Sequence, residues 1–300
     1  ALPIYPNQKI GLGHEVAGEV VKIGAKVTKF KVGDKVLIEP GVPDDTCEYC
    51  RTGRYNICPG VDFMATQPNY KGALTQYMTH PEEWTYHIPE GMTTMEGALV
   101  EPAAVGMHAA VLGGAQPGKS IVILGGGTIG LMVLQACISL GATDITVVDV
   151  IEKRLELAKK LGAARVINGK EEDTVAVLRS EEMYGDHGVD LVFEAAGAVF
   201  TAQQAVQIVS RGGKIMMVGT QSKPVPIDFL KINREVTIQT SFRYCNNFPQ
   251  TIEAISSGRF NVKDMVTNIY DYEDVQKAFE EAIDPVKKTE MVKGVIKVAE

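Results

Sequence analysis

A continuous apolar run ends directly in a cluster of glycines near the middle of this 300-residue chain. Residues 121–124 have the length and composition of a buried strand, and Gly125, Gly127 and Gly130 fit the spacing G-x-G-x-x-G. Helical spacing follows over residues 128–140. A strand that ends in such a turn and opens a helix is typical of a dinucleotide-binding βαβ unit.

The glycines of this turn and an acid farther along have separate mechanical roles. Gly125 permits the tight turn, Gly127 lets the backbone approach a pyrophosphate, and Gly130 allows close helix–strand packing. Asp149 ends the next apolar run, where its carboxylate can accept hydrogen bonds from ribose hydroxyls. Its charge disfavours a 2′-phosphate and so favours NAD over NADP, whereas Arg154 could serve a phosphate or stack on adenine. The alternative is a glycine-rich turn that binds nothing.

Apolar runs alternate with helical patterns over residues 118–240. Further strands are expected at 145–148, 165–167, 190–193 and 214–218, with a helix at 151–161 and others between the later strands. Buried strands that alternate with helices specify a parallel sheet covered on both faces. The predicted fold class is therefore α/β, with a doubly wound parallel sheet.

The regions on either side of this stretch have a different pattern. Residues 11–40 contain short alternating runs, at 19–23 and 34–38, separated by glycines, which predicts short strands and turns. Toward the C-terminus we expect helices near 247–257 and 272–283 and a strand at 291–298. This last strand could return to the first β-rich region.

The composition excludes several classes of protein. With 45% hydrophobic and 22% charged residues, the chain is neither disordered nor fibrous. A formal net charge of −7 gives no broad attraction to nucleic acid or anionic lipid, so neither partner is expected. No uncharged apolar stretch is long enough to span a membrane, and the N-terminus lacks the basic and apolar regions of a signal peptide. We therefore expect a cytoplasmic protein.

Three of the five cysteines, Cys47, Cys50 and Cys58, lie within twelve residues. The C-x-x-C spacing lets two thiolates face one tetrahedral ion, and the clustering indicates metal binding in a reducing compartment. A closed structural zinc site needs a fourth ligand, for which Asp44, three residues before Cys47, is the candidate. The alternative is a lobe of free thiols without metal.

A second metal signal is weaker. His14 and Glu15 could place an imidazole and a carboxylate beside one metal, although an adjacent pair of this kind is usually a surface pair. Glu101, which precedes a proline, would by itself be a solvated loop acid. Both interpretations depend on the comparison with a known family.

Five segments match one family, in addition to the glycine turn. They are residues 11–15, 38–43, 50–56, 97–102 and 242–246. On these motifs the chain resembles the zinc-dependent medium-chain dehydrogenases, and within them the sorbitol (polyol) dehydrogenases, over essentially its whole length. Segment 242–246 argues against the alternatives of a butanediol or threonine dehydrogenase.

The resemblance implies a fold and an activity. The fold is a Rossmann domain at 105–240 and a discontinuous GroES-like β-barrel catalytic domain from 1–104 and 241–300, with part of the barrel missing at the N-terminus. The activity is transfer of a hydride from a secondary alcohol of a small-molecule polyol to NAD, giving a ketose, with catalytic and structural zinc. The assembly implied is a homotetramer.

The resemblance also implies roles for individual residues. His14 and Glu15 correspond to ligands of the catalytic zinc, and Glu101 to the acid that faces the metal and contacts substrate. Arg243 and Tyr244 correspond to the pair that hydrogen-bonds the polyol. Pocket-lining positions fall on Phe63 and Thr66, and cofactor contacts on Gly125, Gly127, Thr128, Ile129, Gly130, Asp149, Arg154, Val218, Gly219, Thr220, Phe242 and Arg243.

Two departures from the family pattern support a second hypothesis. The family has a further segment before the Gly-His-Glu motif, which carries a cysteine ligand of the catalytic zinc, whereas no cysteine precedes His14 in this chain. Asp44 also stands in place of the usual first cysteine of the lobe. The second hypothesis is therefore a truncated, catalytically silent chain that binds NAD and assembles into oligomers.

Overall fold

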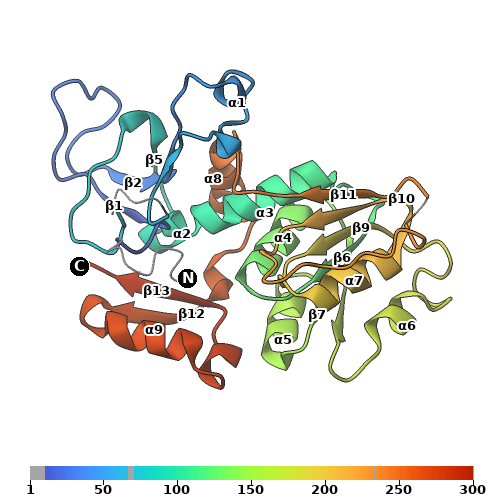
Figure 1. The fold of residues 1–300 in the computed structure, drawn as a ribbon. Coiled ribbons are helices and arrows are strands. Elements are labelled where there is room, and N and C mark those ends of the chain that lie inside the picture. Colours follow the sequence, from blue (N-terminus) through green and yellow to red (C-terminus); the bar gives the residue numbers. More distant parts are fainter. Residues whose placement is uncertain (1–10, 67–70, 233, 300) are drawn as a thin grey trace.

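A six-stranded parallel sheet occupies the middle of the chain in the computed structural model, which describes residues 11–66, 71–232 and 234–299 (Figure 1). The strands, in spatial order, are β11 (Thr237–Thr240), β10 (Val209–Met217), β9 (Val189–Glu194), β6 (Ser120–Leu124), β7 (Asp144–Asp149) and β8 (Arg165–Asn168). All neighbouring pairs are parallel. The chain runs from β6 toward one edge and from β9 toward the other, so ligands are expected at the switch point between them. The predicted doubly wound sheet is confirmed.

Side chains of β6 point alternately into two cores. Ile121 and Ile123 belong to the larger core, with helices α3 (Val100–Gly113) and α4 (Thr128–Ser139). Val122 and Leu124 belong to the other core, with helix α7 (Val199–Ile208). Because both faces of the strand are covered, residues 121–124 are all apolar rather than every second one. Helix α5 (Glu152–Lys160) packs on the first core and α6 (Thr174–Leu178) on the second.

Helices α3 and α4 approach each other closely at Gly106. A Cβ atom at this position would lie 2.5 Å from the carbonyl carbon of Met132, so it would collide with the backbone of α4. Only glycine permits this separation of the two helices. Glu101 lies in the first turn of α3, and α4 begins directly after the glycine turn, so the contact at Gly106 sets the distance between these two features.

The two ends of the chain form a second unit beside the sheet (Figure 1). Its strands are β1 (Ala17–Glu19), β2 (Lys35–Ile38) and β5 (Thr85–His87) in one antiparallel sheet, β3 (Gly41–Val42) paired with β4 (Asp62–Phe63), and β12 (Val266–Asp271) paired with β13 (Lys293–Lys297). Its α-helices are α1 (Glu48–Arg51), α2 (Thr94–Ala98), α8 (Phe248–Ser256) and α9 (Val275–Ile283). Short 3-10 helices are η1 (Tyr55–Ile57), η2 (Glu82–Trp84), η3 (Lys263–Met265), η4 (Tyr272–Asp274) and η5 (Lys287–Thr289). Among the described residues, every helix falls short of the length and apolarity that a bilayer crossing requires.

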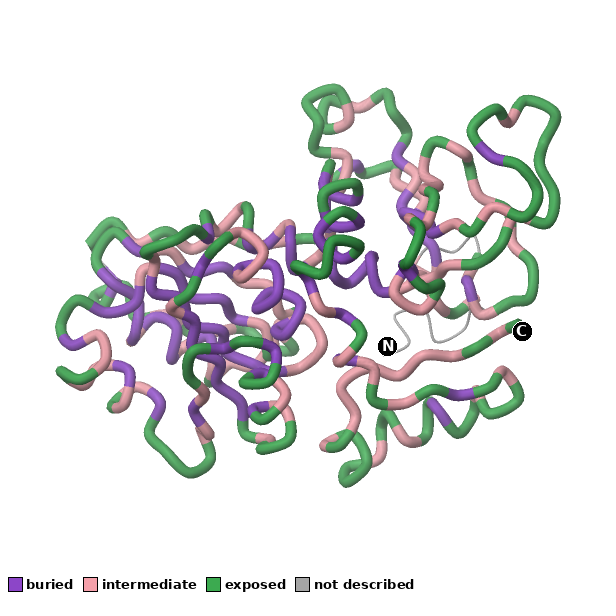
Figure 2. Tube along the Cα trace, turned by 180° about the vertical axis from the view of Figure 1, so that it is seen from behind, coloured by how far each residue is buried: buried purple, intermediate pink, exposed green. Residues whose placement is uncertain are grey.

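Buried residues are concentrated around the parallel sheet (Figure 2). All five residues of β6 are buried, whereas no residue of β13 is. The larger core nevertheless continues from α3 into α8, through Phe248 and Ile252. The two units therefore share one core rather than meeting only at a surface.

Two sequence predictions in the second unit are wrong in detail. The strand expected at 19–23 is instead Ala17–Glu19, and Val21 and Ile23 are exposed, because the alternating pattern does not face a core there. The last strand, β13, is found within the expected range but pairs with β12. In the described chain its link to the first β-rich region is an ion pair between Lys293 and Glu15.

Candidate active site

Three side chains that are far apart in sequence meet between the two units. His14 and Glu15 precede β1, and Glu101 lies in the first turn of α3. One ligand atom from each lies within 4.8 Å of the others, and His14 Nε2 is 4.0 Å from Glu101 Oε2. The Ala73 amide donates a hydrogen bond to the Gly13 carbonyl at 2.8 Å, which fixes the backbone directly before His14. The structure thus brings together all three residues expected at the catalytic zinc.

The electrostatics of this cluster suit a cation. Burial lowers the pKa of His14, which favours the neutral imidazole that a metal ion requires. Burial, together with the nearby charge of Glu15, raises the pKa of Glu101 to about 8. One imidazole and two carboxyl groups, of which that of Glu101 is buried and the others are partly exposed, form a donor set of the kind that binds zinc and leaves a coordination position open. The residues present therefore fit a catalytic zinc ion.

Arg243 and Tyr244 lie in a tight loop after β11. Arg243 has a φ of 52°, a conformation that costs energy for any residue other than glycine. Tyr244 is only 2% exposed, and its buried hydroxyl has no hydrogen-bond partner among the described residues. Phe63 is buried, and the hydroxyl of half-buried Thr66 donates to the Phe63 carbonyl at 3.2 Å. An unsatisfied buried hydroxyl beside a strained arginine is what a polar substrate pocket requires.

The glycine turn has the geometry of a phosphate-binding loop. A Cβ at Gly130 would lie 1.8 Å from the Gly125 oxygen, so this position admits only glycine. A Cβ at Gly127 would meet only Arg154 Nη1, 3.9 Å away, so the space over that backbone is open. Ile129 is half-buried in the first turn of α4. Open backbone at a helix N-terminus fits a pyrophosphate.

Asp149 is held at the end of β7 by the turn itself. The Gly126 amide donates to Asp149 Oδ2 at 2.7 Å, and the amides of Val150 and Ile151 donate to Oδ1. Arg154 Nη1 lies 3.7 Å from the same carboxylate, and Arg154 Nε is buried without a partner in the described chain. The acid and the base expected beside the adenosine ribose therefore lie next to each other at the glycine turn.

The wall expected on the nicotinamide side is organised by Glu194, the last residue of β9. Its carboxylate accepts the amides of Ala196 and Gly197 and the side-chain amide of Gln221. Val218 and Gly219 are half-buried and Thr220 is exposed, and a Cβ at Gly219 would lie 2.4 Å from the Gly197 nitrogen. Phe242 is 52% exposed. Glu194 is a positioning residue that the sequence analysis missed, because nothing in its local pattern marks it.

Lys293 is the second residue that sequence reasoning missed. Its ammonium pairs with Glu15, while the carbonyl of the preceding Val292 accepts a hydrogen bond from Thr128 Oγ1 at 2.5 Å. Two consecutive residues therefore contact the metal-ligand candidates and the first residue of α4. Only the pairing of β13 with β12 brings Lys293 to this place, so no local sequence signal could have identified it.

The cysteine lobe forms a second cluster, around α1 and η1. One ligand atom from each of Asp44, Cys47, Cys50 and Cys58 lies within 4.8 Å of the others. The Sγ atoms of Cys47 and Cys50 are 3.4 Å apart, and Cys50 Sγ is 3.6 Å from Asp44 Oδ1. A tetrahedral zinc ion would separate its ligand atoms by about 3.3–3.8 Å. The four predicted residues thus fit a structural zinc ion.

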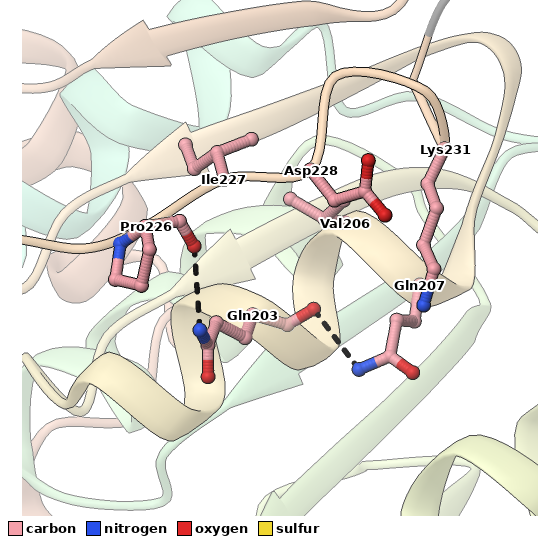
Figure 3. Close-up of a pocket in the computed structure, with 7 residues that line it drawn as sticks. All are labelled: Gln203, Val206, Gln207, Pro226, Ile227, Asp228 and Lys231. Atoms are coloured by element: carbon pink, nitrogen blue, oxygen red, sulfur yellow. Dashed lines mark hydrogen bonds between the residues drawn. The ribbon is translucent and has the colours of Figure 1, made fainter.

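Two cavities lie away from both clusters, on the α7 side of the sheet. The first is lined by Gln203, Val206, Gln207, Pro226, Ile227, Asp228 and Lys231 (Figure 3). In it, the Gln203 side chain donates to the Pro226 carbonyl at 3.3 Å. The second lies around Arg179, Arg211 and Arg234. Neither cavity contains a residue of the His14 cluster.

Comparisons with known proteins agree with this geometry. The family described as "Alcohol dehydrogenase GroES-like domain" matches residues 2–90, and the family described as "Zinc-binding dehydrogenase" matches residues 128–257. The chain is 64% identical over 298 residues to the uncharacterized zinc-type alcohol dehydrogenase-like protein YdjJ of Escherichia coli K12, covering 99% of this chain and 85% of that protein. It is 42% identical over 294 residues to the sorbitol dehydrogenase of Bacillus subtilis, covering 94% and 82%.

A solved structure of a dehydrogenase is also similar to this chain. An Escherichia coli oxidoreductase/dehydrogenase of unknown specificity, involved in membrane biogenesis, superposes with a TM-score of 0.95 at 63% identity, covering 100% of this chain and 85% of that one. The chain therefore belongs to the zinc-dependent medium-chain dehydrogenases, close to the sorbitol dehydrogenases.

Proposed function

We propose that this protein is an oxidoreductase with NAD and zinc as cofactors, which oxidises a secondary alcohol of a polyol to a ketone. One observation carries the proposal. Val292 and Lys293 are consecutive, yet one contacts Thr128 at the nucleotide turn and the other contacts Glu15 in the metal cluster. A dinucleotide on the turn and an alcohol at the cluster would therefore be neighbours, as hydride transfer requires.

His14, Glu15 and Glu101 would hold the zinc ion. When bound, zinc supplies a Lewis acid that lowers the pKa of an alcohol, and the nicotinamide accepts the hydride. Glu101 also faces the substrate, where it can accept a hydrogen bond from a second hydroxyl. Ser241 and Tyr244 each have a buried hydroxyl without a partner in the described chain, which a polar ligand can satisfy.

Selection of a polyol over an alkyl alcohol follows from these polar groups. Arg243 and Tyr244 offer donors to hydroxyls other than the reacting one. An alkyl substrate would leave such buried donors unpaired, and sites of this kind discriminate strongly. Glu101 and Arg243 would also decide which hydroxyl of the polyol reaches the metal.

The direct test is NADH formation from a panel of C4 to C6 polyols, measured with the zinc content of the same preparation. We expect polyol-dependent absorbance and two zinc ions per chain. Arg243→Ala should lower kcat/KM for the polyol by about tenfold or more and weaken NAD binding by a smaller factor. A preparation that binds NAD but oxidises no polyol would instead support the catalytically silent hypothesis, and a preference for butanediol would refute the polyol assignment.

Asp149 is the basis for proposing NAD rather than NADP. Its carboxylate lies where a 2′-phosphate would bring a second negative charge. Asp149→Ala should reduce the ratio of kcat/KM for NAD over NADP by about tenfold or more, since about 1.4 kcal/mol of discrimination corresponds to that factor. Asp149→Asn, which keeps an acceptor for the Gly126 amide, separates charge from loop geometry. A wild-type preference for NADP would contradict this role.

Assembly and location complete the proposal. We propose a cytoplasmic homotetramer, on the resemblance to sorbitol dehydrogenases. Light scattering on the zinc-loaded enzyme tests the tetramer, and a monomer would refute it.

A further inference from the structure

The guanidinium of Arg243 lies over two phenyl rings. Its Cζ atom is 3.8 Å from the centroid of the Phe63 ring, over the ring, and 4.7 Å from the centroid of the Phe242 ring. Both distances are within the range of a cation–π interaction. In the described chain no carboxylate lies within 4.0 Å of this guanidinium and no acceptor takes a hydrogen bond from it. The rings are therefore the groups that hold it.

We infer that Phe63 and Phe242 form an aromatic clamp that fixes the guanidinium of Arg243 for recognition of polyol hydroxyls. Phe63 thus acts as a positioning residue, and not mainly by lining the substrate pocket. The inference rests on the proposed polyol dehydrogenase activity, because it concerns how that site recognises its substrate.

The burial of Phe63 supports a positioning role. The side chain is 4% exposed, so little of the ring remains to contact a substrate. Phe63 in β4 pairs with Gly41 in β3, and a Cβ at Gly41 would lie only 2.9 Å from Phe63 Cδ2. The ring therefore occupies the space that Gly41 leaves free. Its centroid is also 5.5 Å from that of His14, so one ring contacts both the metal-ligand candidate and the guanidinium.

The backbone of Arg243 is held independently of the rings. The side-chain amide of Asn56 donates to the Phe242 carbonyl at 2.9 Å, and the Asn246 amide donates to the Tyr55 hydroxyl at 2.8 Å. Arg243 and Asn246 both have positive φ, at 52° and 57°. Strain of this kind persists where the surrounding structure requires it, often at functional sites.

The clamp leaves the donors of Arg243 free while restricting its rotamers. A long, flexible side chain normally loses much conformational freedom when it binds a ligand. Stacking restricts that freedom before the substrate arrives and occupies no N–H group, so all five guanidinium donors remain for hydroxyls. A hydrogen-bonded or ion-paired arginine would have fewer donors available.

The sharpest test changes the electrons of the Phe63 ring and keeps its shape. Fluorinated phenylalanines with one and then three ring fluorines in place of Phe63 weaken the negative ring face stepwise. We expect kcat/KM for the polyol to fall with each step, reaching about tenfold, as for loss of a partly desolvated cation–π contact. The dissociation constant for NAD should change by less than about twofold. Equal kcat/KM across the series would overturn the inference.

Phe63→Leu and Phe260→Leu form a matched pair of variants. Both remove a buried ring, since Phe260 is 1% exposed, but in the described part of the chain the cation–π contacts of Arg243 are with Phe63 and Phe242, not with Phe260. We expect similar losses of thermal stability, with a raised polyol KM only for Phe63→Leu. Crystal structures provide a readout that needs no activity: the guanidinium should leave its position in Phe63→Leu and keep it in Phe260→Leu. An unmoved guanidinium in Phe63→Leu would refute the clamp. If the wild type oxidises no polyol, the proposed function fails, and these structures still decide whether the clamp exists.

Discussion

The two clusters of metal-ligating side chains differ in how the chain assembles them. The lobe cluster takes four ligands from one segment, between Asp44 and Cys58, with α1 as its only α-helix. The other takes His14 and Glu15 from before β1 and Glu101 from α3, and adds Lys293 from β13. The lobe can therefore form from local geometry, whereas the second cluster exists only once both units have folded together.

The two clusters also differ in the electrostatic environment of their carboxyl groups. In the lobe, the amides of Cys47 and Thr46 lower the pKa of exposed Asp44 to about 2, so this carboxylate is charged at any pH near neutral. In the other cluster, burial is the main cause that raises the pKa of Glu101 to about 8. A structural ion in the lobe would therefore be coordinated near solvent by an ionised carboxylate, whereas the proposed catalytic ion would face the buried carboxyl group of Glu101.

The largest expected effect comes from breaking the long-range cluster. His14→Ala should lower turnover of the polyol by at least about 100-fold, because a direct metal ligand and its orientation are lost. Zinc analysis should fall from two ions per chain to one, with NAD affinity unchanged. His187→Ala is the matched control, since this histidine is exposed and pairs only with Asp190 among the described residues. Full activity of His14→Ala would contradict the assignment.

Removing one thiolate from the lobe cluster should lower the melting temperature of the protein more than its catalytic activity. Cys47→Ser should also remove one zinc ion per chain, but lower the melting temperature by about 5 °C and change kcat/KM by less than about threefold. Cys137→Ala, at a buried cysteine of α4, should leave both zinc ions bound. If Cys47→Ser lost activity as completely as His14→Ala, the two clusters would not be functionally distinct.

The smallest effect concerns the carboxylate in the lobe. Asp44→Cys should slow zinc loss to a chelator by about tenfold, because a fourth thiolate replaces a harder oxygen ligand, and Asp44→Asn should accelerate it by a similar factor. The asparagine keeps an oxygen that can accept from the Thr46 and Cys47 amides, so the turn should persist. Identical rates for all three proteins would mean that residue 44 does not bind the ion.

The same contrast explains how far the sequence could predict this molecule. The sheet strands and the helix after the glycine turn were predictable because β6 and its neighbours are buried on both faces, which produces continuous apolar runs. The clustering of Asp44, Cys47, Cys50 and Cys58 was predictable from their spacing. The strand at 17–19 was misplaced because alternation at 19–23 continues into exposed residues.

Residues that reach the candidate active site from distant parts of the sequence could not be assigned to it from the local sequence pattern. His14, Glu15 and Glu101 were identified only through family resemblance, and Lys293 and Glu194 were missed entirely. Lys293 reaches Glu15 across 278 positions of sequence, which no periodicity encodes. The aromatic contacts of Arg243 are of the same type, because Phe63 belongs to a different strand pair.

The close approach at Gly106 has a consequence for the geometry of reaction. At Gly106, helix α3, which carries Glu101 in its first turn, and helix α4, which follows the glycine turn, approach backbone to backbone with no side chain of residue 106 between them. If a metal ion and a dinucleotide bind as proposed, the spacing between them would be set by main-chain atoms and would not depend on a rotamer. A methyl group added at residue 106 would then separate the two binding sites, although it touches neither of them.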